Sequence, residues 1–260
     1  MARSVVILSA VRTAFGTQGG TLKDFTAQDL AVPTAIEAMK RAGVQPDQVG
    51  HVIYGSVLQT ANDAIYMARH VGLKAGIPQQ IPALTVNRLC GSGFQAVVSG
   101  AEQILLGESN VCLVGGSEAM SMAPHVVHGL REGAKFGRPP AMKDLLWECL
   151  TDTYTGMAMA QTAEKLGEQY SLSRVDVDEV AYASQQRWAE ADAVGRFNDE
   201  IIPFPIKTRK GVVEFKRDEH PRPQTTREVL ASLPPFFKKD GLISAGNASG
   251  ICDGAASLVL

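Results

Sequence analysis

Cys90 is the residue of this chain whose surroundings best suit a nucleophile. It lies between an apolar run, residues 82–86, and a segment whose apolar residues recur at helical spacing from residue 94 to residue 105. We therefore expect Cys90 at or just before a helix N-terminus, where free N–H groups and the helix dipole favour the thiolate and lower the thiol pKa. Gly91 and Gly93 would leave room for a substrate carbonyl beside the sulfur. The alternative is a buried structural cysteine.

The segments before and after Cys90 alternate between strand and helix patterns. The expected strands are residues 4–10, 51–54, 82–86 and 110–114, and the expected helices include residues 64–74 and a segment capped by Thr26 and ended by Gly43. Such alternation predicts an α/β fold with a mostly parallel sheet, whose ligand site lies at the carboxyl ends of the strands. Cys90 and a turn expected at residues 115–117 both fall at such ends.

The alternation stops between about residues 117 and 241, where the chain becomes more polar. This segment predicts helices at residues 157–170 and 174–194 and a hairpin formed by residues 201–207 and 212–215. A buried strand resumes at residues 254–260. We therefore expect a core domain of residues 1–116 and 242–260, interrupted by an inserted domain of residues 117–241.

Composition narrows the class of protein. The 260 residues are 45% hydrophobic and 20% charged, which is typical of a globular protein in water, and a net charge of −2 favours neither nucleic acid nor membrane as a partner. The four cysteines and five histidines show no CxxC pair and no metal-ligand spacing. We therefore expect no metal, and free thiols in a reducing cytoplasm, with a mitochondrial location left open. No run is long and apolar enough to span a bilayer or to act as a signal peptide.

Three motifs carry a resemblance to a known family. Residues 87–93, Asn-Arg-Leu-Cys-Gly-Ser-Gly, resemble the nucleophile motif of the thiolases, and residues 115–121 and 245–250 resemble two further thiolase signatures in the same order. The resemblance runs from Val5 to the last residue, is strongest to the mitochondrial-type 3-ketoacyl-CoA thiolases, and matches the N-terminal half of a thiolase. It implies a mixed, mostly parallel sheet with helices on both faces and an inserted loop domain that covers the active site.

The resemblance also implies an activity. Thiolases cleave 3-ketoacyl-CoA with coenzyme A, or condense two acyl-CoA molecules in reverse, and the acyl thioester intermediate would form on Cys90. Coenzyme A would be a co-substrate with no permanently bound cofactor. The activating histidine, second cysteine and asparagine of the family belong to second-half motifs that do not occur in these 260 residues, so the chain alone is expected to be inactive. The residues that the resemblance places at coenzyme A or substrate are Leu150, Met159, Arg222, Ala245 and Ser249.

Several alternatives stay open. Leu150 and Met159 could equally be core residues, and Arg222 could be a solvated surface charge. A homodimer is expected with residues 82–87 near its interface, and a dimer of dimers through the basic loop from Arg131 to Lys143, which could instead be solvated surface. The other functions considered are an acyl-CoA-binding module without turnover, a non-catalytic scaffold of thiolase-like fold and a ketosynthase of the same superfamily.

Overall fold

The computed structural model describes residues 4–260, which form two compact units. The first contains the residues up to Ala123, together with Phe197–His220 and Ile251–Leu260, and the second contains Pro124–Arg196 and Pro221–Gly250. Residues 197–220 pack in the first unit because Ile202 and Phe204 are buried in its core. The two units therefore divide the chain at other points than the expected insertion of residues 117–241, because residues 117–123 and 197–220 belong to the first unit and residues 242–250 to the second.

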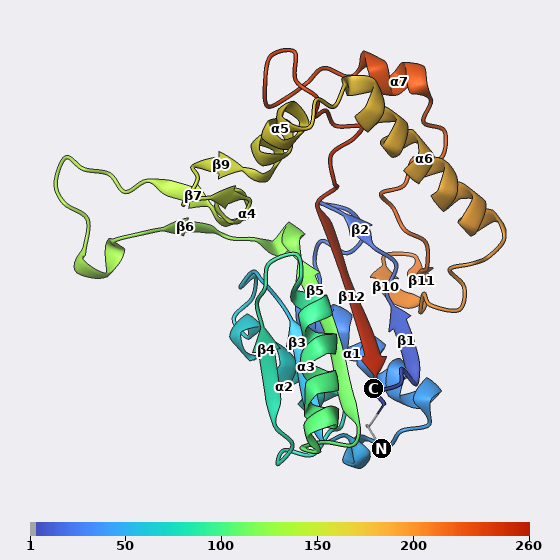
Figure 1. The fold of residues 1–260 in the computed structure, drawn as a ribbon. Coiled ribbons are helices and arrows are strands. Elements are labelled where there is room, and N and C mark those ends of the chain that lie inside the picture. Colours follow the sequence, from blue (N-terminus) through green and yellow to red (C-terminus); the bar gives the residue numbers. More distant parts are fainter. Residues whose placement is uncertain (1–3) are drawn as a thin grey trace. The chain divides into compact units, whose positions relative to one another are not determined.

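The first unit is built on a mixed sheet with the strand order β1-β12-β5-β3-β4, and β2 also pairs with β12 (Figure 1). The pairings of β3 with β4 and of β3 with β5 are parallel, whereas β12 runs antiparallel to β5, β1 and β2. A separate hairpin is formed by β10 and β11, as the sequence predicts. The strands are β1 (Ser9–Arg12), β2 (Gly16–Thr17), β3 (His51–Gly55), β4 (Ala83–Val86), β5 (Cys112–Ala119), β10 (Phe204–Thr208), β11 (Gly211–Phe215) and β12 (Cys252–Val259).

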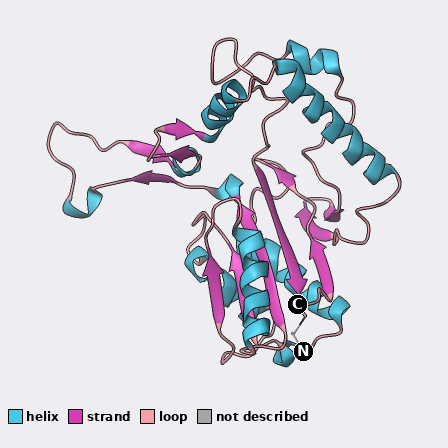
Figure 2. Cartoon of the chain, in the orientation of Figure 1, coloured by secondary structure: helices cyan, strands magenta, loops and turns pink. Residues whose placement is uncertain are grey.

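Helices cover both faces of this sheet, which confirms the predicted α/β class (Figure 2). The helices α1 (Ala27–Ala42) and α2 (Met67–Lys74) enclose the larger apolar cluster, and α3 (Ser92–Leu106) packs on β3 and β5 over a smaller one. The capping box of Thr26 and Asp29 begins α1, and Gly43 ends it in the left-handed conformation with φ 67°. The helix continues through Pro33.

The prediction of a buried strand at residues 4–10 is wrong. The strand β1 covers only Ser9–Arg12, and the side chains of Val6 and Ile7 are 60% and 59% exposed. Ser9 lies opposite Val259, the last residue of β12, and the Leu8 N–H donates to the Val259 carbonyl at 2.8 Å. Residues 4–8 therefore lie outside β1.

The predicted turn at residues 115–117 is also wrong, because these residues lie inside β5. The strand continues to Ala119 since β12 pairs with it along this whole stretch, with Gly115 opposite Ser257. A Cβ atom on Gly115 would lie 2.3 Å from the carbonyl oxygen of Ala256 and 2.7 Å from the Tyr54 ring. The glycine therefore marks a close approach of backbones rather than a turn.

The second unit contains two small strand pairs, four α-helices and a short 3-10 helix at Leu130–Glu132. The helix predictions are confirmed, and Ser173 and Asp176 form a capping box at the start of the longest helix. No helix within residues 4–260 is long and apolar enough to cross a membrane. The elements are β6 (His125–Val127), β7 (Met142–Asp144), β8 (Thr151–Asp152), β9 (Met157–Ala158), α4 (Leu145–Cys149), α5 (Met159–Gln169), α6 (Arg174–Ala193) and α7 (Arg227–Ser232).

Arg12 ties the segment 197–220 to the sheet of the first unit. Its Nε donates to Glu200 and its Nη1 to Asp218, each at 2.7 Å. The side chains of Arg12 and Asp218 are only 14% and 8% exposed. Asp218 also accepts the Phe15 backbone N–H at 2.8 Å. The Arg12 guanidinium therefore compensates the negative charge of the buried Asp218 carboxylate. This carboxylate in turn holds the loop after β1 through the Phe15 N–H.

We predict that Arg12→Met lowers the free energy of unfolding by about 3 kcal/mol, because removing one partner of a buried ion pair leaves the other charge uncompensated. Urea unfolding of the chain measures the change. The matched control is Lys40→Met, which removes an exposed partner 3.4 Å from Glu37 and should change the stability by less than about 0.5 kcal/mol. Equal effects of the two substitutions would contradict the prediction.

Candidate active site

Cys90 lies in the turn between β4 and α3, as the sequence predicts. The strand ends at Val86, the helix begins at Ser92, and the Cys90 side chain is exposed. The preceding residue, Leu89, has φ 49°, a left-handed conformation that is uncommon for a residue with a Cβ atom. The turn therefore presents the thiol to solvent just before the positive end of the helix dipole.

Side chains on either side of Cys90 hold this turn. The Ser92 hydroxyl donates to the Leu89 carbonyl at 2.6 Å and accepts the Arg88 N–H at 2.9 Å. Asn87 Oδ1 accepts the Leu89 N–H at 3.0 Å. These hydrogen bonds involve the backbone of Leu89, the residue with positive φ, and of its neighbour Arg88. They therefore constrain the backbone next to the Cys90 thiol.

Glycines allow the start of α3 to lie against the sheet. A Cβ atom on Gly55, at the end of β3, would lie 2.5 Å from the carbonyl carbon of Ser92. A Cβ atom on Gly116 would lie 3.5 Å from the Cα of Gly93. In contrast, a Cβ atom on Gly93 itself would meet nothing within 4 Å. Packing therefore explains the glycine at position 55 but not the one at position 93, which borders open space next to the Cys90 turn.

The other three cysteines lie in different environments. Cys112 is buried in β5, and burial raises the pKa of its thiol. Burial and the nearby carboxylates of Asp253 and Asp218 likewise raise the pKa of the Cys252 thiol. Cys149 is half-buried at the end of α4. In the described part of the chain, no group of three or more His, Cys, Asp and Glu side chains could hold a metal ion.

The remaining candidate residues belong to the second unit. Leu150 and Met159 lie together, because the Met159 N–H donates to the Leu150 carbonyl at 2.9 Å at the start of α5. The Leu150 side chain is half-buried, whereas that of Met159 is 46% exposed. Arg222 is exposed, and its backbone N–H donates to Gln185 of α6 at 2.7 Å. Met159 and Arg222 thus both lie at the surface of this unit.

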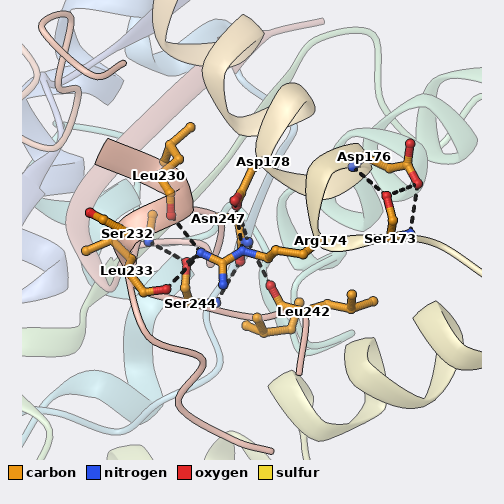
Figure 3. Close-up of polar contacts among 12 residues, drawn as sticks. Ser173, Arg174, Asp176, Asp178, Leu230, Ser232, Leu233, Leu242, Ser244 and Asn247 are labelled. Carbon is orange, nitrogen blue, oxygen red and sulfur yellow. Dashed lines mark hydrogen bonds and ion pairs between the residues drawn. The ribbon is translucent and has the colours of Figure 1, made fainter. Parts of the chain in front are cut away.

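Ala245 and Ser249 lie in one loop, and both are exposed. Arg174 of α6 anchors the start of this loop (Figure 3). Its Nη2 donates to the carbonyls of Leu230 and Leu233 at 2.7 and 3.0 Å and to the Ser244 hydroxyl at 3.2 Å. The same guanidinium donates through Nε to Asp178 at 2.8 Å.

Asn247 completes this network from within the loop (Figure 3). Its Nδ2 donates to Asp178 at 2.8 Å and to the Leu242 carbonyl at 2.9 Å, and its Oδ1 accepts the Ser244 N–H at 2.9 Å. Asp178 is 7% exposed and Ser244 is 1% exposed. The loop that carries Ala245 and Ser249 is therefore held on a mostly buried network of polar side chains.

Sequence reasoning did not identify Arg174 and Asp178. Their spacing of four residues on a helix is a signal for an ion pair, but not for contacts with a loop some seventy residues later. The loop at residues 245–250 also consists mostly of small residues, which suit a close approach of the backbone to a neighbour. At Gly246 the structure gives an internal reason, since a Cβ atom there would lie 2.5 Å from Leu230 and 2.7 Å from Leu233.

The family model that describes the thiolase N-terminal domain matches residues 5–260. The chain belongs to the thiolase family. Human mitochondrial 3-ketoacyl-CoA thiolase is 51% identical over 258 residues, which are 99% of this chain and 65% of that protein. The chain thus spans about 65% of the length of this relative, and it forms the N-terminal portion of the thiolase sequence.

Solved thiolase structures share the fold. The crystal structure of human mitochondrial 3-ketoacyl-CoA thiolase has a TM-score of 0.95 at 51% identity and covers 97% of this chain and 64% of that one. The structure of the human enzyme in complex with CoA has a TM-score of 0.92 at 50% identity, covering 97% of this chain and 63% of that one. The mixed α/β architecture of this thiolase chain is therefore that of its relatives.

We predict that substoichiometric iodoacetamide labels Cys90 before the other three thiols. Cys90 is exposed at a helix start, whereas burial protects Cys112 and raises the pKa of both the Cys112 and the Cys252 thiol, which lowers the fraction of reactive thiolate. Peptide mapping by mass spectrometry measures the distribution of label. Faster labelling of any other cysteine would contradict the assignment of the nucleophile.

Proposed function

We propose that this chain carries the nucleophile of an acyl-CoA acyltransferase that cleaves 3-ketoacyl-CoA with coenzyme A, or condenses two acyl-CoA molecules in reverse. The observation that carries the proposal is the exposed thiol of Cys90, located just before α3 in the motif that resembles the thiolase nucleophile motif. A scaffold protein would have no need of a thiol in this position. A protein that only binds acyl-CoA would leave the Cys90 thiol unmodified in the presence of acetyl-CoA.

The chemistry follows from the position of Cys90. Its thiolate attacks the 3-keto carbonyl, the bond between C2 and C3 breaks, and the electron pair leaves on C2, which takes up a proton to give acetyl-CoA. The thiolate of a second coenzyme A then attacks the thioester carbonyl and displaces the Cys90 sulfur. The positive end of the α3 dipole favours the negative charge on the attacking sulfur. The proton transfers need an acid and a base, which the family resemblance places outside these 260 residues.

Coenzyme A would contact the second unit. The exposed thioether of Met159, beside Leu150, offers an apolar surface for the pantetheine chain, and the loop of Ala245 and Ser249 offers polar contacts to its amides. Arg222 would bind near the adenine end, where its charge suits the phosphates. The human relative crystallised with CoA supports this class of ligand. No permanently bound cofactor or metal is part of the proposal.

The proposed compartment is the cytoplasm, with the mitochondrion as the alternative because the human relative is mitochondrial. The proposed assembly is a homodimer, and a dimer of dimers would form through the loop from Arg131 to Lys143. This loop is exposed along its length and carries the exposed apolar side chains of Phe136 and Met142 as well as its basic residues. An exposed apolar side chain beside flexible cations suits a contact between subunits.

We predict that acetyl-CoA transfers its acetyl group to Cys90 of the 260-residue chain, whereas thiolysis of acetoacetyl-CoA shows no repeated turnover. Thioester exchange needs only the thiolate, but acid and base groups each contribute roughly two to four powers of ten to the full reaction. Peptide mass spectrometry measures the acetyl group, and loss of the enolate absorbance measures thiolysis. The control is Cys90→Ser. A protein that only binds acyl-CoA would show affinity for coenzyme A in titration but leave Cys90 unmodified. Repeated turnover that Cys90→Ser abolishes would show that the chain carries its own base.

We further predict that the chain forms a dimer through the outer edge of β4. This strand ends the sheet, it pairs with β3 on one side, and Leu84 is 46% exposed, so a second copy of β4 can add across a two-fold axis. Light scattering should find a dimer at micromolar concentration, and Leu84→Lys should weaken it at least tenfold by placing like charges together (roughly 1.4 kcal/mol). The control is Val194→Lys, which alters a side chain that is 82% exposed in the second unit. A monomeric wild-type chain, or equal effects of both variants, would contradict the prediction.

A further inference from the structure

Glu118 is a mostly buried carboxylate near the end of β5. Its Oε2 accepts the Val57 N–H at 2.9 Å and its Oε1 accepts the Leu58 N–H at 3.0 Å. Burial raises the pKa of the Glu118 carboxyl, and the hydrogen bonds from Leu58, Val57 and Ser56 oppose that rise. A carboxylate in such a place is costly, and here both of its oxygens are used to hold one short segment, residues 56–58, directly after β3.

The segment that Glu118 holds lies beside the turn that carries Cys90. The Ser56 N–H donates to the carbonyl of Val86, the last residue of β4, at 3.2 Å. The Asn87 side-chain amide donates to the Val57 carbonyl at 3.5 Å, and the other end of the same amide accepts the Leu89 N–H at 3.0 Å. A continuous path of hydrogen bonds therefore runs from Glu118 through Val57 and Asn87 to the residue before Cys90.

The Cys90 turn needs such support. Leu89 has φ 49°, and a residue with a Cβ atom keeps this conformation only where the surrounding structure over-determines it. Ser92 supports the turn from the helix side. Glu118 supports it from the sheet side, from a strand whose pairings with β3 and β12 fix its position.

We propose that Glu118 is a positioning residue for Cys90, which acts through the segment 56–58 and Asn87 and touches no substrate. The proposal rests on the proposed function, in which Cys90 is the nucleophile. The carboxylate sets the position of the Val57 carbonyl, the carbonyl sets the Asn87 amide, and the amide holds Leu89. The consequence is that the sulfur of Cys90 stays at the start of α3, where the helix end favours its charge.

The test is Glu118→Gln in the full 260-residue chain. The amide has one acceptor oxygen and an NH₂ group that would face a backbone N–H, so one of the two bonds to the segment is lost. A matched control exists in the second unit, where the buried Glu164 accepts the N–H groups of Leu242 and Ile243 at 2.8 and 2.7 Å. Glu164→Gln therefore removes the same kind of bond from a carboxylate of the other unit.

The measurements are the rate of Cys90 alkylation by iodoacetamide as a function of pH, the rate for Cys252 in the same sample, and the unfolding midpoint. Glu118→Gln should change the rate of Cys90 labelling about fivefold across the pH profile, because the loosened turn no longer holds the sulfur in one position at the start of α3. Labelling of Cys252 should stay unchanged. Glu164→Gln should lower the unfolding midpoint without moving the Cys90 profile.

Three outcomes would decide against these claims in different ways. An unchanged Cys90 profile in folded Glu118→Gln overturns the positioning role and leaves the proposed function standing. A wild-type Cys90 that reacts no faster than Cys252 contradicts the proposed function itself. If Glu118→Gln does not fold, as judged by circular dichroism, Asn87→Ala breaks the same path one step later, and an unchanged profile in that variant overturns the positioning role.

Discussion

The start of α3 lies directly on the backbone of two parallel strands, and the candidate active site depends on this contact. Gly55 ends β3 where a Cβ atom would collide with Ser92, and Gly116 of β5 faces the Cα of Gly93. Because no side chain separates helix from sheet, the turn between β4 and α3 has little freedom. Cys90 therefore lies in a turn that is held by the contact between the start of α3 and the sheet.

The sheet beneath this contact is completed by β12, which lies between β1 and β5. A buried polar cluster fixes its position, since the hydroxyls of Tyr54 and Thr34 are each hydrogen-bonded to Ser257 at 2.6 Å. Burial raises the pKa of the Tyr54 phenol, so that it stays protonated and can serve as a donor. This cluster joins α1, β3 and β12, and it explains why serine is accepted at the centre of the sheet.

Both units use buried carboxylates to hold loops. Glu118 and Glu164 each accept two consecutive backbone N–H groups, and Asp178 accepts Arg174 and the Asn247 amide. A carboxylate oxygen accepts strong hydrogen bonds, so it can replace the strand or helix partner that a loop backbone lacks. The segments fixed in this way are those next to Cys90 and those that carry Ala245 and Ser249.

The local sequence by itself determined that Cys90 lies at a helix start, that α1 and α6 begin with capping boxes and that β10 and β11 form a hairpin. Each of these features depends on side chains within a few residues of one another. Only the tertiary structure decided that Gly115 lies within a strand and that residues 197–220 pack in the first unit. These two features depend on where β12 and Arg12 find their partners, more than a hundred residues away in the chain. A glycine in a turn and a glycine under another backbone look the same in the sequence, and only the pairing of distant strands distinguishes them.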